Sequence, residues 1–291
     1  MIAFARRNRI HIILFILTVA TTCFAGGIGS TPTGGLRFSI TEGLSYSIPI
    51  ILILLGHEMG HYFMSRRHGI KATLPFFLPF PLPPFGTLGA VIRMEGTVSS
   101  RKALFDTGVA GPLTSLILSI PAIVIGLTLS TVVPISHFTD ENHLAVPPLF
   151  SFIQQLVIGD VPYNFDILLH PIGFAGWAGL FVTSLNLLPI GQLDGGHIVY
   201  ALFGRRSRVI FLIAIAVMAF ITVFYNPGWI LLLILIILFG FRHPPPMDDI
   251  TPLDWKRKLL GGFVFLAFFL SFTPVPFPEI TGWFKQYLHW F

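Results

Sequence analysis

The segment from Ile51 to Phe63 has the sequence ILILLGHEMGHYF, which places two histidines and a glutamate inside an apolar stretch. A charged side chain at the centre of a membrane helix costs about 2.5–3.5 kcal/mol on insertion scales. Ionisable residues in such segments are therefore rare, and they are functional candidates by default. For this reason His57, Glu58 and His61 are the first candidates for a functional site.

The composition is that of a membrane protein. Of the 291 residues, 54% are hydrophobic and 11% are charged, and the mean hydropathy is +0.80. A single cysteine excludes an intramolecular disulfide and a multi-cysteine metal site. The net charge of +5 does not indicate nucleic-acid binding, because the basic residues flank apolar segments and form no stripe with interleaved aromatics. We therefore expect an all-α polytopic membrane protein.

Seven apolar segments are candidate membrane helices. The first follows a short basic N-terminus, and we expect an uncleaved helix there in preference to a signal peptide, because the run before Cys23 lacks the apolar residue expected ahead of a lipidated cysteine. The segments are 11–26, 44–64, 103–133, 171–188, 209–225, 229–241 and 259–272. They predict about six to seven transmembrane helices, with six applying if two segments form a re-entrant pair.

The basic residues orient these segments, because lysine and arginine are concentrated in cytoplasmic loops. If the N-terminus is cytoplasmic, all 18 basic residues except Arg37 and Lys285 lie at cytoplasmic ends. This orientation requires a tight external turn at 225–229. We therefore expect a multi-pass protein with a cytoplasmic N-terminus, in a bacterial inner membrane or an organellar membrane.

Two connecting segments are unusual. The sequence LPFFLPFPLPP, Leu74 to Pro84, has too many prolines for a helix and is too apolar for a solvated linker. The following FGTLGAVIRMEG, Phe85 to Gly96, has the pattern of a strand with glycines that allow close backbone approach. Together they predict a small membrane-associated β-hairpin or re-entrant segment. The second connection, 134–166, is polar with one amphipathic piece, Leu149 to Gly159.

The histidines and the glutamate have the spacing of a metal site. Residues four apart lie on one face of a helix, so His57 and His61 can point their rings at one ion, with Glu58 nearby but not required as a ligand. Two neutral nitrogens that hold Zn²⁺ and a carboxylate that accepts a proton from water are the parts of a zinc hydrolase. HExxH matches often arise by chance on soluble helices, but chance does not explain three costly residues in an apolar span.

A catalytic zinc site has three protein ligands and one open position. The sequence NLLPIGQLDGGHIVY, Asn186 to Tyr200, interrupts a membrane helix with proline and glycine before Asp194. Irregular backbone at membrane depth is tolerated where it is packed in protein or lines a water-filled cavity. Asp194 and His197 are both candidates for the third ligand.

These motifs resemble the site-2 protease family of intramembrane zinc metalloproteases. The resemblance rests on HEMGH and NLLPIGQLDGGH, and it extends to GTLGAVIRM and to GVAGPLTSL, Gly108 to Leu116. The stretch HPIGFAGWAGLFVTSLNLLPIGQLDGGH is similar to the EGY-like branch, and the sequence lacks the PDZ module between the motifs and the C-terminal CBS domain of two other branches. The resemblance covers roughly 44–203, which we expect to be the catalytic core between an N-terminal helix with an external loop, 1–43, and C-terminal helices, 204–291.

The resemblance implies the site chemistry and the partners. It favours Asp194 over His197 as the third ligand, beside His57 and His61, and it implies one Zn²⁺ per chain with Glu58 as the catalytic residue. Family members cut transmembrane helices of other proteins in regulated intramembrane proteolysis, so the expected partners are transmembrane protein substrates within the lipid bilayer, and no nucleic acid.

Substrate binding is predicted at two places. Asn186, an amide near the broken helix, is a candidate for holding the substrate backbone or an oxyanion. An unwound substrate helix needs partners for its backbone groups, and a strand edge supplies them by β-augmentation. The alternative is that the hairpin packs only against the protein's own helices. The residues predicted to form this edge are Gly86, Thr87, Leu88, Gly89 and Ala90.

Several other polar residues have structural interpretations. We expect His68 and His170 to be loop or interface residues, and Arg101 and Asp106 to belong to the start of a helix. Two other functions compete with proteolysis. A metal-ion transporter would show ligands spread across the bilayer and often inverted repeats, and neither is present in the sequence. An inactive metal-binding scaffold would have no need of Glu58.

Overall fold

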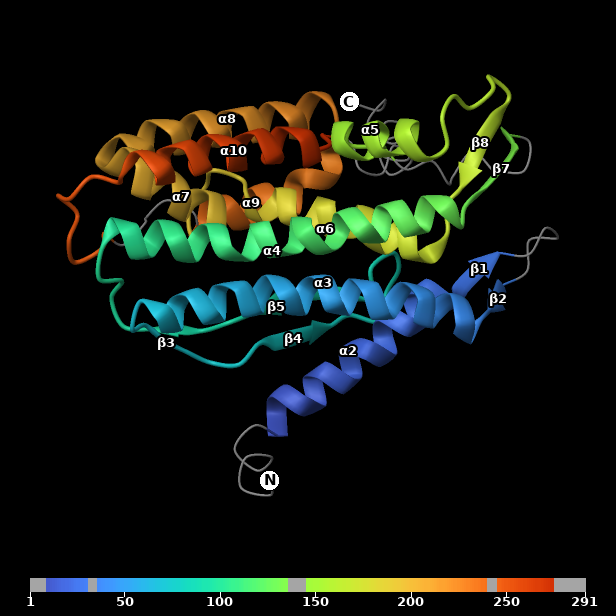
Figure 1. Cartoon of the computed structure of the whole chain (residues 1–291), viewed down its shortest axis with the longest axis horizontal. Helices are drawn as coiled ribbons and strands as arrows, with labels where there is room; N and C mark the ends of the chain where they lie inside the picture. Colours follow the sequence, from blue (N-terminus) through green and yellow to red (C-terminus); the bar gives the residue numbers. More distant parts are fainter. Residues whose placement is uncertain (1–8, 31–35, 136–144, 240–244, 275–291) are drawn as a thin grey trace, which may run out of the picture. The chain divides into compact units, whose positions relative to one another are not determined.

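The computed structural model describes residues 9–30, 36–135, 145–239 and 245–274 (Figure 1). Arg6, Arg7, Arg242 and Lys285, which entered the orientation argument, lie outside the described residues. The described residues are mostly helical, with four small two-stranded sheets. The elements are α2 (Arg9–Gly27), β1 (Ile28–Ser30), β2 (Leu36–Phe38), α3 (Ile40–Arg67), β3 (Lys71–Ala72), β4 (Phe76–Pro79), β5 (Thr87–Val91), β6 (Met94–Glu95), α4 (Arg101–Thr128), β7 (Thr131–Pro134), α5 (Pro148–Val157), β8 (Phe165–Leu168), α6 (Pro171–Asn186), α7 (Asp194–Phe203), η2 (Gly204–Arg206), α8 (Ser207–Phe224), η3 (Pro227–Trp229), α9 (Ile230–Phe239) and α10 (Trp255–Ser271).

Four helical stretches in the described residues are long and apolar enough to cross a membrane, judged by length and composition: Arg9–Gly27, Ile40–Arg67, Arg101–Thr128 and Asp194–Phe224. The prediction of a helical membrane protein is therefore confirmed, while the count of six to seven crossings stays a prediction. The helix expected over 103–133 is too long, because it ends at Thr128 and β7 follows. β7 has the sequence TVVP, whose β-branched residues favour extended backbone and whose proline cannot continue a helix.

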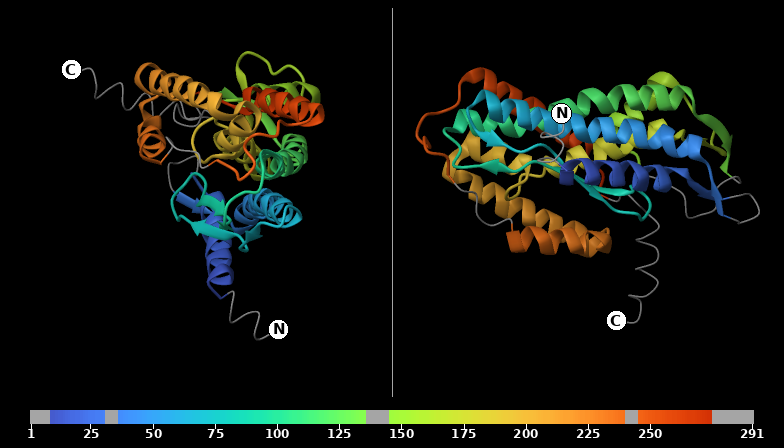
Figure 2. Two further views of the ribbon diagram at one scale, coloured as in Figure 1. Left: turned by 90° about the vertical axis from the view of Figure 1, so that its left-hand side faces the viewer. Right: turned by 90° about the horizontal axis from the view of Figure 1, so that it is seen from below.

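One compact unit comprises Met1–Gly96, Ala110–Thr131 and Leu168–Val182. In it, α2 packs along α3 and against β4 (Figure 1; Figure 2). The buried hydroxyls of Thr22 and Ser47 lie 2.6 Å apart and join α2 to α3. The side chain of Ser39 caps the start of α3 by accepting from the N–H of Glu42, which satisfies one of the amides that a helix N-terminus leaves free.

The hairpin predicted from the proline-rich segment is present as β4 and β5, which pair antiparallel with a register shift between Phe77 and Pro79. β4 is fastened to α2, because His11 Nδ1 lies 3.0 Å from the carbonyl oxygen of Pro75 and Phe77 is buried. The hydroxyl of Tyr46, on α3, donates to the carbonyl of Phe85 at 3.0 Å. These contacts hold the hairpin beside the helix that carries the HEMGH motif.

The single strand expected over 85–96 is wrong in one respect, because the structure divides it into β5 and β6. Between β5 and β6 the backbone stops pairing with β4 and forms hydrogen bonds with Thr73 instead. The N–H of Arg93 donates to Thr73 Oγ1 at 3.1 Å, and the N–H of Thr73 donates to the carbonyl of Arg93 at 3.0 Å. β6 then pairs with β3 instead of β4.

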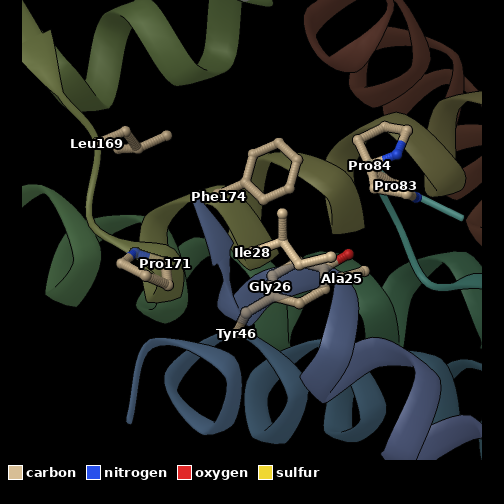
Figure 3. Close-up of a pocket in the computed structure, with 9 residues that line it drawn as sticks. All are labelled: Ala25, Gly26, Ile28, Tyr46, Pro83, Pro84, Leu169, Pro171 and Phe174. Atoms are coloured by element: carbon tan, nitrogen blue, oxygen red, sulfur yellow. The ribbon is translucent and has the colours of Figure 1, made fainter. Parts of the chain in front are cut away.

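A cavity of about 290 Å³ lies in this unit, and Figure 3 shows the side chains around it. Tyr46 and Phe174 line it, together with the cis-linked Pro83–Pro84 pair and the end of α2. The rings of Phe174, Trp177 and Phe181 stack along α6 with centroids 5.6 Å apart at each step. Stacked rings of this kind add to area burial, so the beginning of α6 is firmly packed.

The second compact unit comprises Thr97–Val109, Val132–Ile167 and Thr183–Phe291. A partly buried ion pair joins the first turns of α4 to α10, because Arg257 Nε and Nη2 each donate to one oxygen of Asp106 at 2.7 Å. Arg101 Nε lies 3.3 Å from Oδ1 of Asp249. The other carboxylate oxygen of Asp249, Oδ2, accepts a hydrogen bond from the hydroxyl of Tyr200 at 3.1 Å. Arg101 and Asp106, which were expected to have structural roles, therefore pair with Asp249 and Arg257 respectively.

The remaining elements of this unit follow the sequence pattern. The amphipathic segment forms α5, with Phe150 and Ile153 buried. The tight turn expected at 225–229 is present, with Asn226 Oδ1 accepting from the N–H of Gly228. Asp254 caps α10, and the hydrogen bond that it accepts from the backbone of Arg257 lowers the pKa of its carboxyl.

Candidate metal centre

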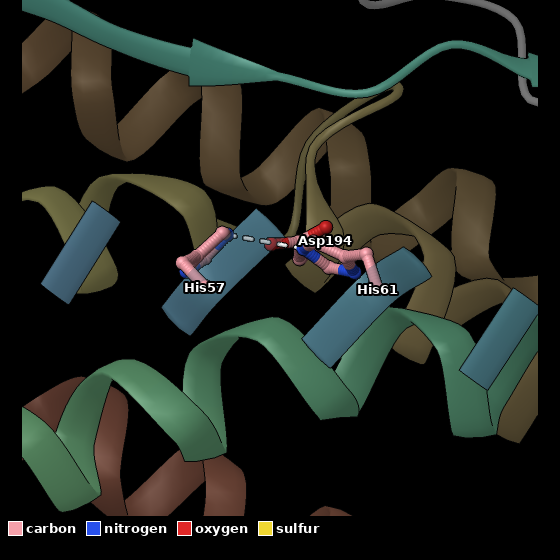
Figure 4. A group of neighbouring side chains, drawn as sticks. All are labelled: His57, His61 and Asp194. Carbon is pink, nitrogen blue, oxygen red and sulfur yellow. Dashed lines mark hydrogen bonds between the residues drawn. The ribbon is translucent and has the colours of Figure 1, made fainter. Parts of the chain in front are cut away.

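α3 carries His57, Glu58 and His61 in its interior turns, and all three side chains are buried, with exposed fractions of 4%, 7% and 7%. The Nε2 atoms of the two histidines lie 3.0 Å apart (Figure 4). The four-residue spacing therefore brings the rings together as the helical geometry predicts.

The separation of these nitrogens suits a shared zinc ion. Two imidazole nitrogens at 2.0–2.1 Å from zinc, in tetrahedral arrangement, would lie about 3.3 Å apart. The observed 3.0 Å is close to this value. The donor set is also appropriate, because imidazole nitrogen is a common zinc ligand.

α4 reaches the histidines through glycine positions. A Cβ atom on Gly60 would lie 2.6 Å from the carbonyl oxygen of Ala110, so α3 and this part of α4 approach at backbone distance. A Cβ atom on Gly111 would lie 2.1 Å from His61 Nε2. Any larger residue at 111 would collide with the ring, so the absence of a side chain there makes room for the imidazole of His61.

Ser115 is a site residue that the sequence analysis missed. Its side chain is buried, and its Oγ lies 3.1 Å from His57 Nδ1. It follows Gly111 by one helical turn, within the GVAGPLTSL segment already singled out for its resemblance. That i, i+4 spacing was the available signal, but without knowledge of which face of α4 meets α3 it could not be interpreted.

Asp194 is the first residue of α7, after a turn that follows α6. The turn packs against the first residues of α7, because a Cβ on Gly195 would lie 2.0 Å from the carbonyl oxygen of Leu187. His197 lies one turn further along α7. A Cβ atom on Gly108 would lie 3.1 Å from the Cβ atom of His197. Glycines in the DGGH motif thus allow the interrupted helix to restart tightly after the turn.

One group of three possible metal-ligating side chains occurs in the described part of the chain: His57, His61 and Asp194 (Figure 4). One ligand atom from each lies within 4.8 Å of the others. His197 is not a member of this group.

The residues predicted to bind substrate occupy distinct places. Asn186 is the last residue of α6. On β5, Thr87 is buried and Leu88 is 68% exposed, while Ala90 pairs with Phe77.

Of the two hairpin glycines, Gly86 precedes β5 and Gly89 lies within it. Gly86 and Gly89 both have positive φ, 72° and 100°. The N–H of Gly89 donates to Thr87 Oγ1 at 3.0 Å, so a local side chain accepts from this amide. In the loops, His68 caps the end of α3, and His170 Nδ1 accepts from the N–H of Ile172 at 3.3 Å, as expected for structural histidines.

The chain is similar to a family of peptidases and to proteins named as probable zinc metalloproteases. The sequence model of peptidase family M50 matches residues 45–225. The chain is 30% identical over 250 residues to "Probable zinc metalloprotease EGY1, chloroplastic" and 31% identical over 252 residues to "Probable zinc metalloprotease EGY2, chloroplastic", both of Arabidopsis thaliana, and these matches cover 81% and 84% of the chain. It is also 28% identical over 278 residues, 90% of the chain, to "Probable zinc metalloprotease EGY3, chloroplastic" of Oryza sativa subsp. japonica.

The matches cover less of the relatives than of this chain. The chain spans 44% of the length of the EGY1 and EGY2 relatives and 47% of the EGY3 relative. The matched region includes both HEMGH and the DGGH motif.

Proposed function

Because this chain belongs to peptidase family M50, we propose that it is a zinc-dependent intramembrane metalloprotease that hydrolyses peptide bonds within or near transmembrane segments of other membrane proteins. The observation that carries the proposal is the buried histidine pair on a membrane-length helix, with Nε2 atoms 3.0 Å apart and a buried glutamate next to it. The names of the relatives, which read "Probable zinc metalloprotease", support the same reaction.

His57, His61 and Asp194 would hold one Zn²⁺, a set of two nitrogens and one oxygen that leaves a fourth position open. Bound there, zinc would polarise the scissile carbonyl and make water a better nucleophile at neutral pH. His197 is the competing third ligand, and the grouping of ligand atoms within 4.8 Å supports Asp194 instead.

Glu58 is proposed as the general base. It accepts a proton from the attacking water and then delivers that proton to the nitrogen of the departing amine, so that the carboxylate is regenerated. Its burial supports this role, because few water molecules compete for the carboxylate. A metal-holding scaffold or an ion carrier would not need this residue.

Substrate is proposed to bind as an extended strand along the edge formed by Gly86, which precedes β5, and by the β5 residues Thr87, Leu88, Gly89 and Ala90. Support comes from the sheet itself, in which β5 pairs with β4 on one side, and from the packing of β5 against α3. Main-chain hydrogen bonds along a strand edge tolerate varied side chains. Asn186 is proposed to hold the substrate backbone or the developing oxyanion.

The proposed topology has six to seven membrane crossings and a cytoplasmic N-terminus, with 1–43 as the N-terminal helix and external loop, 44–203 as the catalytic core and 204–291 as the C-terminal helices. His61 precedes the basic Arg66 by five residues, which corresponds to about 8 Å along a helix. Cleavage is therefore expected inside the bilayer, on the cytoplasmic side.

The substitution Glu58→Gln tests the function. The amide preserves the size of the side chain but cannot accept a proton from water, so we expect zinc to remain bound and cleavage of a model transmembrane substrate to fall by at least about 100-fold. Zinc content is measured by elemental analysis and cleavage by mass spectrometry of the products. Near-normal cleavage by this variant would exclude Glu58 as the base and would reopen the scaffold and transporter alternatives.

A further inference from the structure

Ser115 lies on the face of α4 that meets the two histidines. The face is defined by Gly111, which abuts His61, and by Ser115 one turn later, which abuts His57. Ser115 is 2% exposed, so water has little access to its hydroxyl. The contact between Ser115 Oγ and His57 Nδ1, at 3.1 Å, is therefore a buried polar interaction whose direction matters.

The backbone of α4 determines that direction. A hydroxyl has one proton to donate and two lone pairs. Ser115 Oγ lies 3.0 Å from the carbonyl oxygen of Pro112 and 3.2 Å from that of Gly111, and carbonyl oxygens can only accept. The proton of Ser115 is directed back to its own helix, as is common for serine within helices. The oxygen can then accept the N–H of His57 Nδ1.

We infer that Ser115 is a positioning residue that holds His57 in the tautomer and ring orientation needed for metal binding. A neutral imidazole carries a proton on one nitrogen only. When Nδ1 carries it, Nε2 keeps its lone pair, and Nε2 is the atom that faces His61. The opposite tautomer would place a proton on Nε2, where a metal ligand needs the lone pair.

A hydroxyl is suited to this environment. Metal-ligating histidines commonly donate their second N–H to a carboxylate, a backbone carbonyl or water. A further carboxylate beside Glu58 would bury a second negative charge in an apolar span, which is costly. Ser115 provides the acceptor without adding charge, and its own proton is satisfied within α4.

The inference rests on the proposed zinc site, and it is tested by zinc affinity and spectroscopy in the purified full-length protein. Loss of an outer-shell partner of a zinc-ligating histidine typically weakens metal binding by 10–100-fold. We expect Ser115→Ala to weaken zinc binding by about that factor, measured by competition with a chromophoric chelator. The visible absorption of the Co²⁺-substituted protein should also change, because the His57 ring is no longer held.

Ser119→Ala is the matched control. Ser119 is fully buried one turn further along α4, and its hydroxyl has no hydrogen-bond partner among the described residues. The control variant should bind zinc and Co²⁺ as the wild type does. A second pair isolates the hydroxyl from side-chain shape: Ser115→Thr should retain zinc affinity, and its isostere Ser115→Val should lose it.

The outcomes separate this inference from the proposed function. If the wild type binds no zinc, the proposed function fails. If the wild type binds zinc and Ser115→Ala matches Ser119→Ala in affinity and Co²⁺ spectrum, the positioning role is overturned. If Ser115→Ala does not fold, the Thr and Val variants decide, and equal zinc affinity in the two would overturn the role.

Discussion

Replacing Gly111 with alanine would place a methyl carbon 2.1 Å from His61 Nε2 and 2.6 Å from Cδ2 and Cε1 of the same ring. Ordinary van der Waals contact begins at 3.4 Å, so the imidazole would have to retreat by about 1.3 Å along this direction. The ring cannot absorb this displacement locally, because His61 is buried and its Nε2 lies 3.0 Å from that of His57.

The displacement is large compared with the tolerance of a metal site. Ligand distances in zinc sites hold to within about 0.2 Å, and a 1 Å misplacement in a catalytic site can cost about 100-fold. We therefore expect Gly111→Ala to weaken zinc binding by at least about 100-fold and to reduce cleavage in parallel. Overpacking should also lower the free energy of unfolding by about 1–3 kcal/mol.

The assay is zinc titration of the metal-depleted protein in detergent, with thermal unfolding measured on the same sample. The control is Gly262→Ala in α10, where a Cβ would meet no atom within 4 Å. Alanine is the better helix former, so the control should keep its zinc affinity and gain up to about 1 kcal/mol in stability. Zinc affinity of Gly111→Ala equal to that of the control would refute the assignment of His61 Nε2 as a ligand.

Three further predictions address the third ligand, the substrate edge and the ion pair of α4. Asp194→Ala should abolish stoichiometric zinc binding while His197→Ala retains it, and the reverse result in elemental analysis would identify His197 as the ligand. Proline placed at successive positions of β5 removes one amide donor at a time, and we expect cleavage to be lost at alternate positions with zinc retained; normal cleavage throughout would exclude substrate pairing along this strand. Asp106→Asn should lower the free energy of unfolding by about 1–3 kcal/mol, because it weakens a bidentate pair with Arg257 that is largely shielded from water. Arg37→Gln is the control, because it removes the exposed ion pair between Arg37 and Glu42, and it should change the free energy of unfolding by less than about 1 kcal/mol. Equal effects of the two substitutions in denaturant unfolding would contradict the claim that burial makes the Asp106–Arg257 pair the more stabilising of the two.

Local chemistry made much of this protein predictable. The helices follow from apolar runs whose length matches a bilayer, and His57 and His61 meet because helical spacing brings residues four apart together. The hairpin was predictable because proline excludes a helix in Leu74 to Pro84, and the tight turn before α9 followed from its asparagine, proline and glycine. These features depend on neighbours in sequence, so they can be inferred without knowledge of the fold.

Other features depend on which surfaces meet, and only the tertiary structure decided them. Ser115 contacts His57 because glycines let α4 approach α3 at backbone distance, and the sequence does not specify which face of α4 is turned inward. The pairing of Asp106 with Arg257 joins residues 151 positions apart, which no local pattern encodes. The division of the expected strand into β5, which pairs with β4, and β6, which pairs with β3, has the same origin. A backbone amide donates its hydrogen bond to whichever acceptor the packing brings within reach. Sequence by itself therefore determined the histidine pair and the membrane-length helices, while the packing of helices and strands decided which side chains lie against that pair.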